Sequence, residues 1–249
     1  MQSGFARNVT PRTLIVIPTY NEREGVAAIV EAVRASVPDA SILIVDDASP
    51  DGTGDVADTL AARDAQVRVK HRAGKEGLGP AYVDAFAQAL DEGWQRIVQM
   101  DADFSHDPND IPRLLAGLDS GADLVIGSRY VKGGGTANWG FRRRLVSRGG
   151  SFYARTILGV PIRDLTGGFK AWKADTLRAV SLADVGAKGY GFQIEMTHRA
   201  LGSGARVVEI PIRFVDRRVG QSKMSGTIFA EALTIVWRLR LGTKAGPKR

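Results

Sequence analysis

Short apolar runs alternate with amphipathic stretches along the first half of the chain. The runs predict strands at 13–18, 42–45, 67–70, 96–100 and 124–127. The stretches between them carry apolar side chains at helical spacing and predict helices at 24–36, from Thr53 onward, at 79–92 and at 110–118. Strands that are apolar throughout and joined by helices are typical of a parallel sheet covered on both faces. The pattern therefore predicts an α/β fold with a mainly parallel central sheet.

The second half of the chain has a less regular pattern. Gly133, Gly134 and Gly135 predict a flexible loop, and a basic amphipathic helix is expected at Phe141–Leu158. A strand is expected at 206–214. We expect the chain to be organised as a flexible N-terminus at 1–12, a main domain at 13–226, an amphipathic C-terminal helix at 227–241 and a basic tail at 242–249.

The composition is that of a globular protein with one substantial core. The chain has 249 residues, no apolar window of the roughly 20 residues that span a membrane, and no secretory leader. It has no cysteine, which excludes disulfides and thiolate chemistry and fits a cytosolic protein. Its three histidines do not have the spacing of a metal site. We therefore expect a cytoplasmic protein.

The formal net charge is +7, and the excess is unevenly placed. Eight Lys or Arg and no acid lie between Arg129 and Arg163, including Arg142, Arg143 and Arg144. Such a patch is typical of a surface that binds phosphate, anionic lipid or nucleic acid. A nucleic-acid-binding module is disfavoured, because the patch lacks interleaved aromatic residues for stacking and leaves the acidic residues of the chain without a function.

Two carboxylates follow the strand predicted at 96–100. Asp101 and Asp103 are separated only by Ala102. Open α/β sheets bind ligands at the carboxyl ends of their strands, and two close carboxylates are tolerated mainly where a cation lies between them. Oxygen ligands suit Mg²⁺ or Mn²⁺, which bind through one or two carboxylates plus substrate phosphates. The alternative is a turn in which aspartate caps a helix.

Polar motifs also follow three other predicted strands. They are PTYNE from Pro18, DDASPDG from Asp46 and GSRY from Gly127. In a parallel sheet these strand ends and the acid pair meet at one edge, which favours a binding site over separate turns. Together they offer apolar and aromatic surface for a base, Asp47 for base or ribose, and a metal-binding acid pair for a diphosphate. The sequence therefore predicts a nucleotide site.

A set of motifs extends over most of the chain, from about Leu14 to about Met224. They read PTYNE, VDDASPDGT, GLGPAY, MDADFSHDP, GSRYVKGG, NWGFRRRLVSRGG and DLTGGFKAW. In this combination the chain resembles the dolichol- and polyprenol-phosphate mannose synthases of the inverting glycosyltransferase family 2. The resemblance implies the glycosyltransferase A fold, a Rossmann-like αβα sandwich, and the spanless type of these enzymes.

The resemblance also implies roles for individual residues. The guanosine of the donor would be held by Pro18, Tyr20, Glu22, Val45 and Asp47. The diphosphate and its metal would be held by Asp101, Ala102 and Asp103. The acceptor phosphate would be gripped by Arg129 and Arg143, and Arg217 and Lys223 would close over the donor diphosphate. Asp101, Asp103, Arg129 and Arg143 are the catalytic candidates.

Two positions depart from the pattern of the family. Relatives often carry Gln two residues after the second aspartate of the pair, as an extra metal ligand, and this chain has Ser105. A hydroxyl is a weaker neutral ligand, so either Ser105 or water is expected there. Some relatives carry Lys where Gly191 stands, so one donor contact is missing or supplied elsewhere.

The implied reaction is metal-dependent transfer of mannose from GDP-mannose to polyprenyl phosphate with inversion at the anomeric carbon. The acceptor phosphate is mostly a dianion at pH 7, because its second pKa is about 6, so no general base is required. An alternative keeps the fold and the lipid and changes the donor to a UDP-sugar, such as UDP-glucose.

The implied acceptor is a membrane lipid, although no span is predicted. We expect peripheral contact with the cytoplasmic face of a membrane, and a separate integral-membrane partner protein remains open. The helix at 227–241 has an apolar face beside Arg238 and Arg240 and is a candidate for this contact. The alternative is that this helix packs on the sheet as part of the core.

Overall fold

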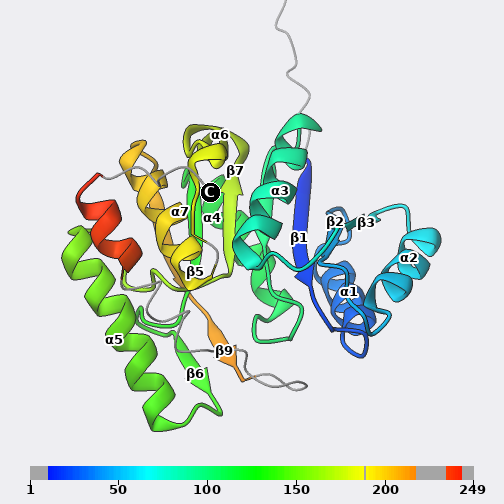
Figure 1. Cartoon of the computed structure of the whole chain (residues 1–249), viewed down its shortest axis with the longest axis horizontal. Helices are drawn as coiled ribbons and strands as arrows, with labels where there is room; N and C mark the ends of the chain where they lie inside the picture. Colours follow the sequence, from blue (N-terminus) through cyan, green and yellow to red (C-terminus); the bar gives the residue numbers. More distant parts are fainter. Residues whose placement is uncertain (1–10, 188, 217–233, 243–249) are drawn as a thin grey trace, which may run out of the picture.

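The computed structural model describes residues 11–187, 189–216 and 234–242, and a seven-stranded sheet lies at its centre (Figure 1). The strand order is β3-β2-β1-β4-β7-β5-β8. All neighbouring strands are parallel except at β7, which is antiparallel to both β4 and β5. The bounds are β1 Thr13–Thr19, β2 Ser41–Asp46, β3 Val67–His71, β4 Arg96–Gln99, β5 Leu124–Ser128, β7 Lys170–Lys173 and β8 Val207–Pro211. The expected α/β fold with a mainly parallel sheet is confirmed.

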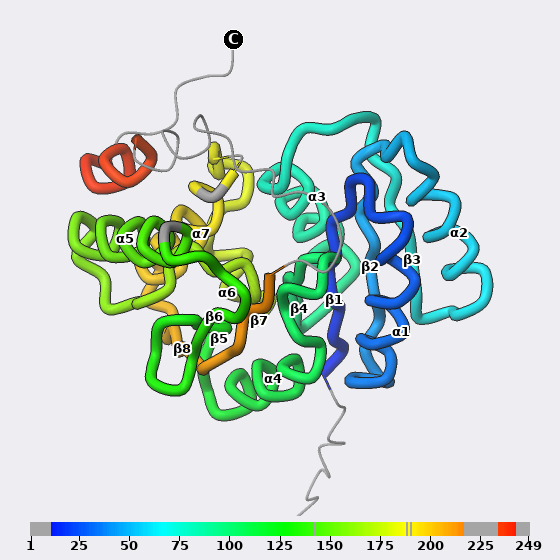
Figure 2. The backbone as a smooth tube through the Cα atoms, turned by 90° about the horizontal axis from the view of Figure 1, so that it is seen from below, coloured from blue at the N-terminus to red at the C-terminus, as the bar shows by residue number. Residues whose placement is uncertain are grey.

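Helices cover both faces of this sheet, as Figures 1 and 2 show. Helices α1, α2 and α4 pack on one face, and α3, α5, α6 and α7 pack on the other. The bounds are α1 Val26–Ser36, α2 Thr53–Arg63, α3 Leu78–Asp91, α4 Ile111–Asp119, α5 Phe141–Leu158, α6 Ala174–Ala179 and α7 Tyr190–Gly202, with short 3₁₀ helices at Pro108–Asp110 and Leu182–Asp184.

Strand β1 illustrates how one strand serves both layers of the core. Its Leu14 and Val16 belong to the cluster beneath α3, while Ile15 and Ile17 belong to the cluster beneath α1 and α4. All four side chains are fully buried. Successive side chains of a strand point to opposite faces, so a strand covered on both faces must be apolar at every position. This requirement is the physical origin of the apolar runs in the sequence.

Most elements of the first half agree with the sequence pattern within two residues, and the strand expected at 206–214 is present as β8 (Val207–Pro211) but ends earlier than expected. The chain leaves the main sheet after Pro211, and β9 (Arg213–Val215) instead pairs with β6 (Gly135–Ala137) in a separate two-stranded sheet. The glycine run expected to form a loop therefore ends in a strand. A Cβ atom at Gly134 would lie 2.5 Å from the Ser128 carbonyl oxygen, so only glycine permits this close approach.

The C-terminal helix expected at 227–241 is described only from residue 234, where the chain is helical. Ile235 and Val236 are buried in the cluster of α3, α5 and α7, whereas Trp237 and Leu241 are 52% and 70% exposed. The described part of the helix thus packs on the core and still presents apolar side chains to the outside. Residues 1–10 of the expected flexible N-terminus and residues 243–249 of the basic tail lie outside the described residues.

Candidate functional site

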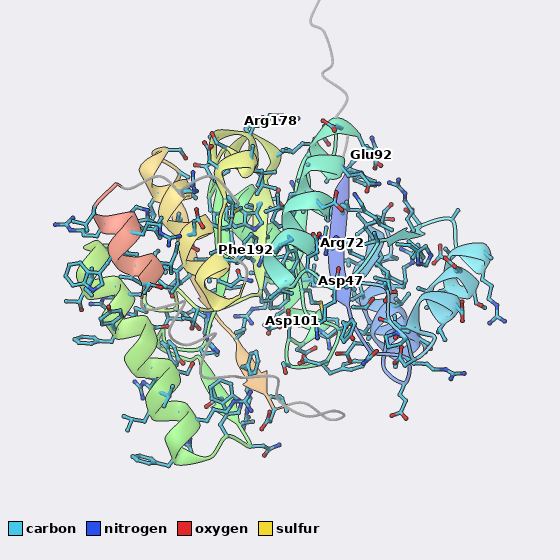
Figure 3. The ribbon with its side chains drawn as sticks, in the orientation of Figure 1. Asp47, Arg72, Glu92, Asp101, Arg178 and Phe192 are labelled. Atoms are coloured by element: carbon cyan, nitrogen blue, oxygen red, sulfur yellow. The ribbon has the colours of Figure 1, made fainter. Side chains whose placement is uncertain are left out.

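The acid pair follows the carboxyl end of β4, and Figure 3 shows its first residue, Asp101, at the lower end of the central strands. The turn that follows is held by its own polar groups. One oxygen of Asp103 accepts a hydrogen bond from the backbone N–H of Ser105 (3.0 Å), and Phe104 between them has a positive φ of 58°. Ser105 is buried, and its carbonyl accepts a hydrogen bond from the backbone N–H of Val215 in β9 (3.2 Å). The turn is therefore tied to the second sheet.

His106 stabilises this turn through a hydrogen bond to its backbone. Its Nδ1 accepts a hydrogen bond from the backbone N–H of Asp101 (3.2 Å), and its ring stacks on Phe169 at 4.9 Å between centroids. Burial lowers the pKa of His106, although the charges of Asp101 and Asp103 oppose this effect. A neutral imidazole suits a ring whose Nδ1 must accept. The histidine spacing gave no sign of this role.

Asp47, at the end of β2, lies beside a cationic side chain that the sequence did not single out. Arg72, after β3, forms an ion pair with Asp47 and further ones with Glu76 (2.6 Å) and Asp84 (3.6 Å). Figure 3 shows Asp47 and Arg72 together near the lower end of β1. Arg72 also lines a cavity of about 300 Å³. That volume is at the lower end of the range for small-ligand sites.

The other residues expected to contact the nucleotide base lie at the same carboxyl edge of the sheet. Pro18 of β1 is the register partner of Val45 of β2, and Val45 is fully buried. The ammonium of Lys75 lies 3.9 Å from the ring centre of Tyr20. The backbone N–H of Glu22 donates to the Thr53 hydroxyl at 2.9 Å.

Arg129, after β5, is bound to a buried carboxylate. Its Nε donates to one oxygen of Asp164 at 2.7 Å and its Nη2 to the other at 2.6 Å, and Nη2 also donates to the Thr166 hydroxyl at 2.8 Å. Burial tends to raise the pKa of Asp164, but the charge and hydrogen bonds of Arg129 outweigh it and lower that pKa. Arg129 was expected at the acceptor phosphate, and that role stays a prediction.

Arg143, on the first turn of α5, lies over the indole ring of Trp139 at 4.2 Å and pairs with Asp216 at 2.6 Å. Its Nε is buried and has no hydrogen-bond partner in the described part of the chain, and the same holds for Trp139 Nε1. Two buried donors without an acceptor are costly unless a ligand supplies one. Trp139 stands in the motif NWGFRRR, but its role was not foreseen.

A chain of ring contacts joins the acid pair to this arginine. The ring of His106 meets Phe214 edge-on at 5.3 Å, and Phe214 in turn meets Trp139 edge-on at 5.3 Å. Phe214 belongs to β9, so the small second sheet places its aromatic side chain between the two parts of the site. The structure thus brings the acid pair, Arg129 and Arg143 together around one aromatic cluster.

Two expected residues, Arg217 and Lys223, lie outside the described residues. Close packing explains the glycine at position 191, where some relatives are expected to carry Lys. A Cβ atom there would lie 3.1 Å from Ile235 Cγ2 and 3.3 Å from Ala187 Cβ. Glycine therefore allows the C-terminal helix to pack closely on α7, and any side chain at this position would require Ile235 or Ala187 to shift by a few tenths of an ångström.

The residues of the acid turn fit a divalent cation that shares its ligands with a substrate. Asp101 and Asp103 offer two carboxylates at a sheet edge, and the side chain of Asp101 is 32% exposed. Within the described ranges no group of three or more His, Cys, Asp or Glu could hold a metal. Two carboxylates completed by phosphate oxygens and water match the usual surroundings of Mg²⁺ at nucleotides.

A mostly parallel α/β sheet with an acid pair at the end of a central strand, beside a cationic and aromatic cluster, defines a glycosyltransferase of the A fold. The model of glycosyl transferase family 2 matches residues 14–180. An undecaprenyl-phosphate mannosyltransferase of Micrococcus luteus is 50% identical over 94% of this chain and 96% of its own. A polyprenol monophosphomannose synthase of Mycolicibacterium smegmatis is 49% identical over 93% and 88%. The chain belongs to glycosyltransferase family 2, in its polyprenyl-phosphate mannosyltransferase branch.

Solved structures support the fold. Glucosyl-3-phosphoglycerate synthase from Mycobacterium tuberculosis, in complex with Mn²⁺, UDP-glucose and phosphoglyceric acid, matches with a TM-score of 0.67 at 20% identity, over 95% of this chain and 82% of that one. A mannosyltransferase from Pyrobaculum calidifontis, in complex with GDP-mannose and Mn²⁺, matches with a TM-score of 0.57 at 16% identity, over 93% and 70%. Among the described residues no helix is both long and apolar enough to span a membrane.

Proposed function

We propose that this enzyme transfers mannose from GDP-mannose to polyprenyl phosphate and inverts the anomeric carbon. The observation that supports the proposal is the chain of ring contacts from the acid turn to Arg143, since it joins the residues that would bind the diphosphate to those that would bind a second anion. Relatives at about 50% identity carry the corresponding names. Attack of an acceptor phosphate on a sugar diphosphate is a reaction that uses both anion sites.

On the donor side, Asp47 and Tyr20 would hold the guanosine. Asp47 is an acceptor for the N–H groups of a base or the hydroxyls of a ribose, and Arg72 fixes its orientation. Tyr20, whose ring carries the Lys75 ammonium over one face, would contribute aromatic surface beside the base. Pro18, Glu22 and Val45 would complete the wall, and Arg217 and Lys223 would meet the diphosphate.

The metal would be held by Asp101 and Asp103, with Ser105 or water as a further ligand. When bound, it supplies positive charge to the departing diphosphate. The chain itself holds the turn: the Ser105 N–H donates to the Asp103 carboxylate and the Asp101 N–H donates to His106 Nδ1, so the Asp103 carboxylate and the Asp101 backbone are positioned by the protein. Such preorganisation lowers the reorganisation that the reaction requires. Both Mg²⁺ and Mn²⁺ suit these oxygen ligands.

On the acceptor side, Arg143 and Trp139 would hold the lipid phosphate. Both present buried N–H donors without partners in the described residues, and the guanidinium adds the charge that offsets a dianion. Arg129 lies close by, over the rings of Tyr130 and Phe214, with its charge balanced by Asp164. We expect Arg143 to make the stronger contribution to acceptor binding.

The reaction then needs alignment more than acid–base chemistry. A phosphate oxygen of the acceptor forms a bond to the anomeric carbon while the bond from that carbon to the diphosphate breaks, and GDP leaves. Because the acceptor is already a dianion, no proton has to be removed. The protein positions two anions in line, and this positioning supplies much of the rate enhancement.

Peripheral membrane contact would follow from two helices that lie side by side in Figures 1 and 2. All large apolar side chains that are exposed in the described residues lie on α5 or on residues 234–242, namely Phe141, Leu145, Val146, Phe152, Trp237 and Leu241. Arg144, Arg148 and Arg155 are exposed on the same helix α5. Apolar and basic groups together are the signature of an interfacial helix. Such contact would place the enzyme at the cytoplasmic leaflet.

A transfer assay tests the proposal. Wild-type protein is incubated with polyprenyl phosphate and either GDP-mannose or UDP-glucose, each radiolabelled in the sugar, and the organic-extractable label is counted. We expect label only from GDP-mannose, and only when Mg²⁺ or Mn²⁺ is present. Label from UDP-glucose instead would support the alternative donor, and no label from either would refute a polyprenyl-phosphate glycosyltransferase.

A further inference from the structure

Gln193, on the first turns of α7, holds a fixed orientation inside the protein. It is 2% exposed, and its Oε1 accepts hydrogen bonds from Lys170 Nζ (2.9 Å) and Gln99 Nε2 (2.8 Å). Gln99 is itself oriented by Trp172, whose indole can only donate and does so to Gln99 Oε1 at 2.9 Å. Because the Trp172 indole is donor-only, it fixes the orientation of the Gln99 amide, and Gln99 Nε2 in turn fixes which end of the Gln193 amide is oxygen.

The other end of the amide points to an unused donor. Gln193 Nε2 is buried and has no hydrogen-bond partner in the part of the chain that the structure describes. A Cβ atom built on Gly168 would lie 3.4 Å from this nitrogen, 3.6 Å from His106 Cε1 and 3.8 Å from Asp101 Oδ2. The missing side chain of Gly168 thus leaves a small space between a buried amide donor and a carboxylate of the acid pair.

The antiparallel strand β7 creates this juxtaposition. It runs against its neighbours, so it begins at the edge where β4 ends, and Gly168 just before it reaches Asp101. Gln193 of α7 is held beside Gly168, because Lys170 of β7 binds both the side chain and the backbone carbonyl of Gln193. Lys170 and Gln193 therefore act as one rigid support for the amide.

We propose that the Gln193 amide and the Asp101 carboxylate together bind a hydroxyl group of the transferred sugar, with Gly168 leaving the space for it. A carboxylate only accepts and the free end of the amide only donates, so a group between them must do both. A hydroxyl does both, whereas a phosphate oxygen would be repelled by Asp101. The inference rests on the proposed function, because it assigns the sugar of the donor to this space.

Two variants test the site from different sides. Gln193→Glu keeps an oxygen for Lys170 and Gln99 and replaces the free donor by an acceptor, which faces Asp101 unfavourably. Gly168→Ala adds one methyl group at ordinary contact distances, so the protein tolerates it while the space is filled. Thr197→Val is the matched control, since it removes another hydrogen bond of Lys170 and leaves the space unchanged.

The measurement uses GDP-mannose and its four monodeoxy mannose analogues, with kcat/KM for transfer and calorimetric Kd for donor binding. We expect kcat/KM with GDP-mannose to fall about tenfold or more in both site variants. With one particular deoxy analogue the variants and wild type should differ little, because that analogue lacks the hydroxyl that the site binds. Thr197→Val should keep the wild-type ranking of donors.

Equal losses with all five donors would show that Gln193 holds a water or the fold rather than the sugar, and would overturn the inference. Unchanged Kd and kcat/KM in Gln193→Glu would overturn it as well. Failure of the proposed function is seen separately, because wild-type protein would then transfer no mannose at all. Circular dichroism and thermal unfolding of each variant confirm that the comparison is between folded proteins.

Discussion

Arg129 binds both carboxylate oxygens of Asp164, at 2.7 and 2.6 Å, inside a site where Asp164 is fully buried. The sequence places these residues 35 positions apart, and only the antiparallel return of the chain toward β7 brings them together. Their pairing decides how much positive charge Arg129 can offer to a phosphate, and it makes Asp164 a residue on which the stability of the site depends.

Asp164→Asn should destabilise the protein by about 3–5 kcal/mol, because it leaves the guanidinium of Arg129 buried without its counter-charge. The measurement is the free energy of unfolding in urea at pH 7. Asp175→Asn is the control, since Asp175 is 93% exposed and its pairing with Arg178 should contribute at most about 1 kcal/mol. Equal effects of the two changes would contradict a buried, functional pair.

Lys170→Met should change how stability depends on pH. Burial lowers the pKa of Lys170 from 10.5 to about 7, although Asp164 opposes the shift. Between these two values the unfolded chain binds a proton that the folded chain does not, so stability rises with pH, by about 1.4 kcal/mol per unit for a full proton. Urea unfolding at pH 8 and 9 should show this slope in wild type and a smaller one in the variant. A slope that persists unchanged would refute the shift.

Asp103→Ala should reduce the transfer rate at least about a hundredfold, roughly the 2.7 kcal/mol expected on loss of one strong transition-state stabiliser. The cause would be loss of the metal that bears the charge of the departing diphosphate. The measurement is initial rate against Mg²⁺ and Mn²⁺ concentration. Asp175→Ala, on the exposed end of α6, is the control. Full activity of Asp103→Ala in the presence of a chelator would rule out the metal site.

Arg143→Ala should raise the KM for polyprenyl phosphate at least about tenfold and leave the Kd for GDP-mannose nearly unchanged, since a charge-assisted hydrogen bond contributes about 1.5–3 kcal/mol. Kinetics in detergent with a short-chain acceptor and calorimetry with GDP-mannose measure the two effects. Arg144→Ala, one residue further along α5 and exposed, is the control. The reverse pattern would assign Arg143 to the donor.

Replacing Phe141, Leu145 and Phe152 together by Ser should weaken binding to anionic vesicles at least about tenfold, because each loses apolar surface that enters the interface. Vesicle sedimentation measures this effect, and raised salt should weaken the remaining binding. GDP-mannose binding is the internal control. Removal of everything after Gly226 is a poorer test, because Ile235 and Val236 are part of the core. Unchanged sedimentation of the triple variant would refute contact through α5.

The aspartates of the acid turn show how much of the site the sequence could predict. Asp101 and Asp103 follow an apolar strand, and parallel strands bring their carboxyl ends to one edge, so local pattern and general topology sufficed. The same reasoning found Asp47 and the basic start of α5. The basic partner of Asp47 was missed, because Arg72 follows β3 in an unremarkable charged segment and nothing in sequence spacing marks its direction.

The sequence by itself determined the alternation of strands and helices, the position of the acid pair and the family motifs, because each of these depends on residues that are close together in the chain. Only the tertiary structure decided that β7 runs antiparallel between β4 and β5, and that Pro211 ends one strand before another begins in a second sheet. Those arrangements place Asp164, Gly168 and Gln193 at the site. They depend on contacts between residues far apart in the chain, whose energies no local pattern records.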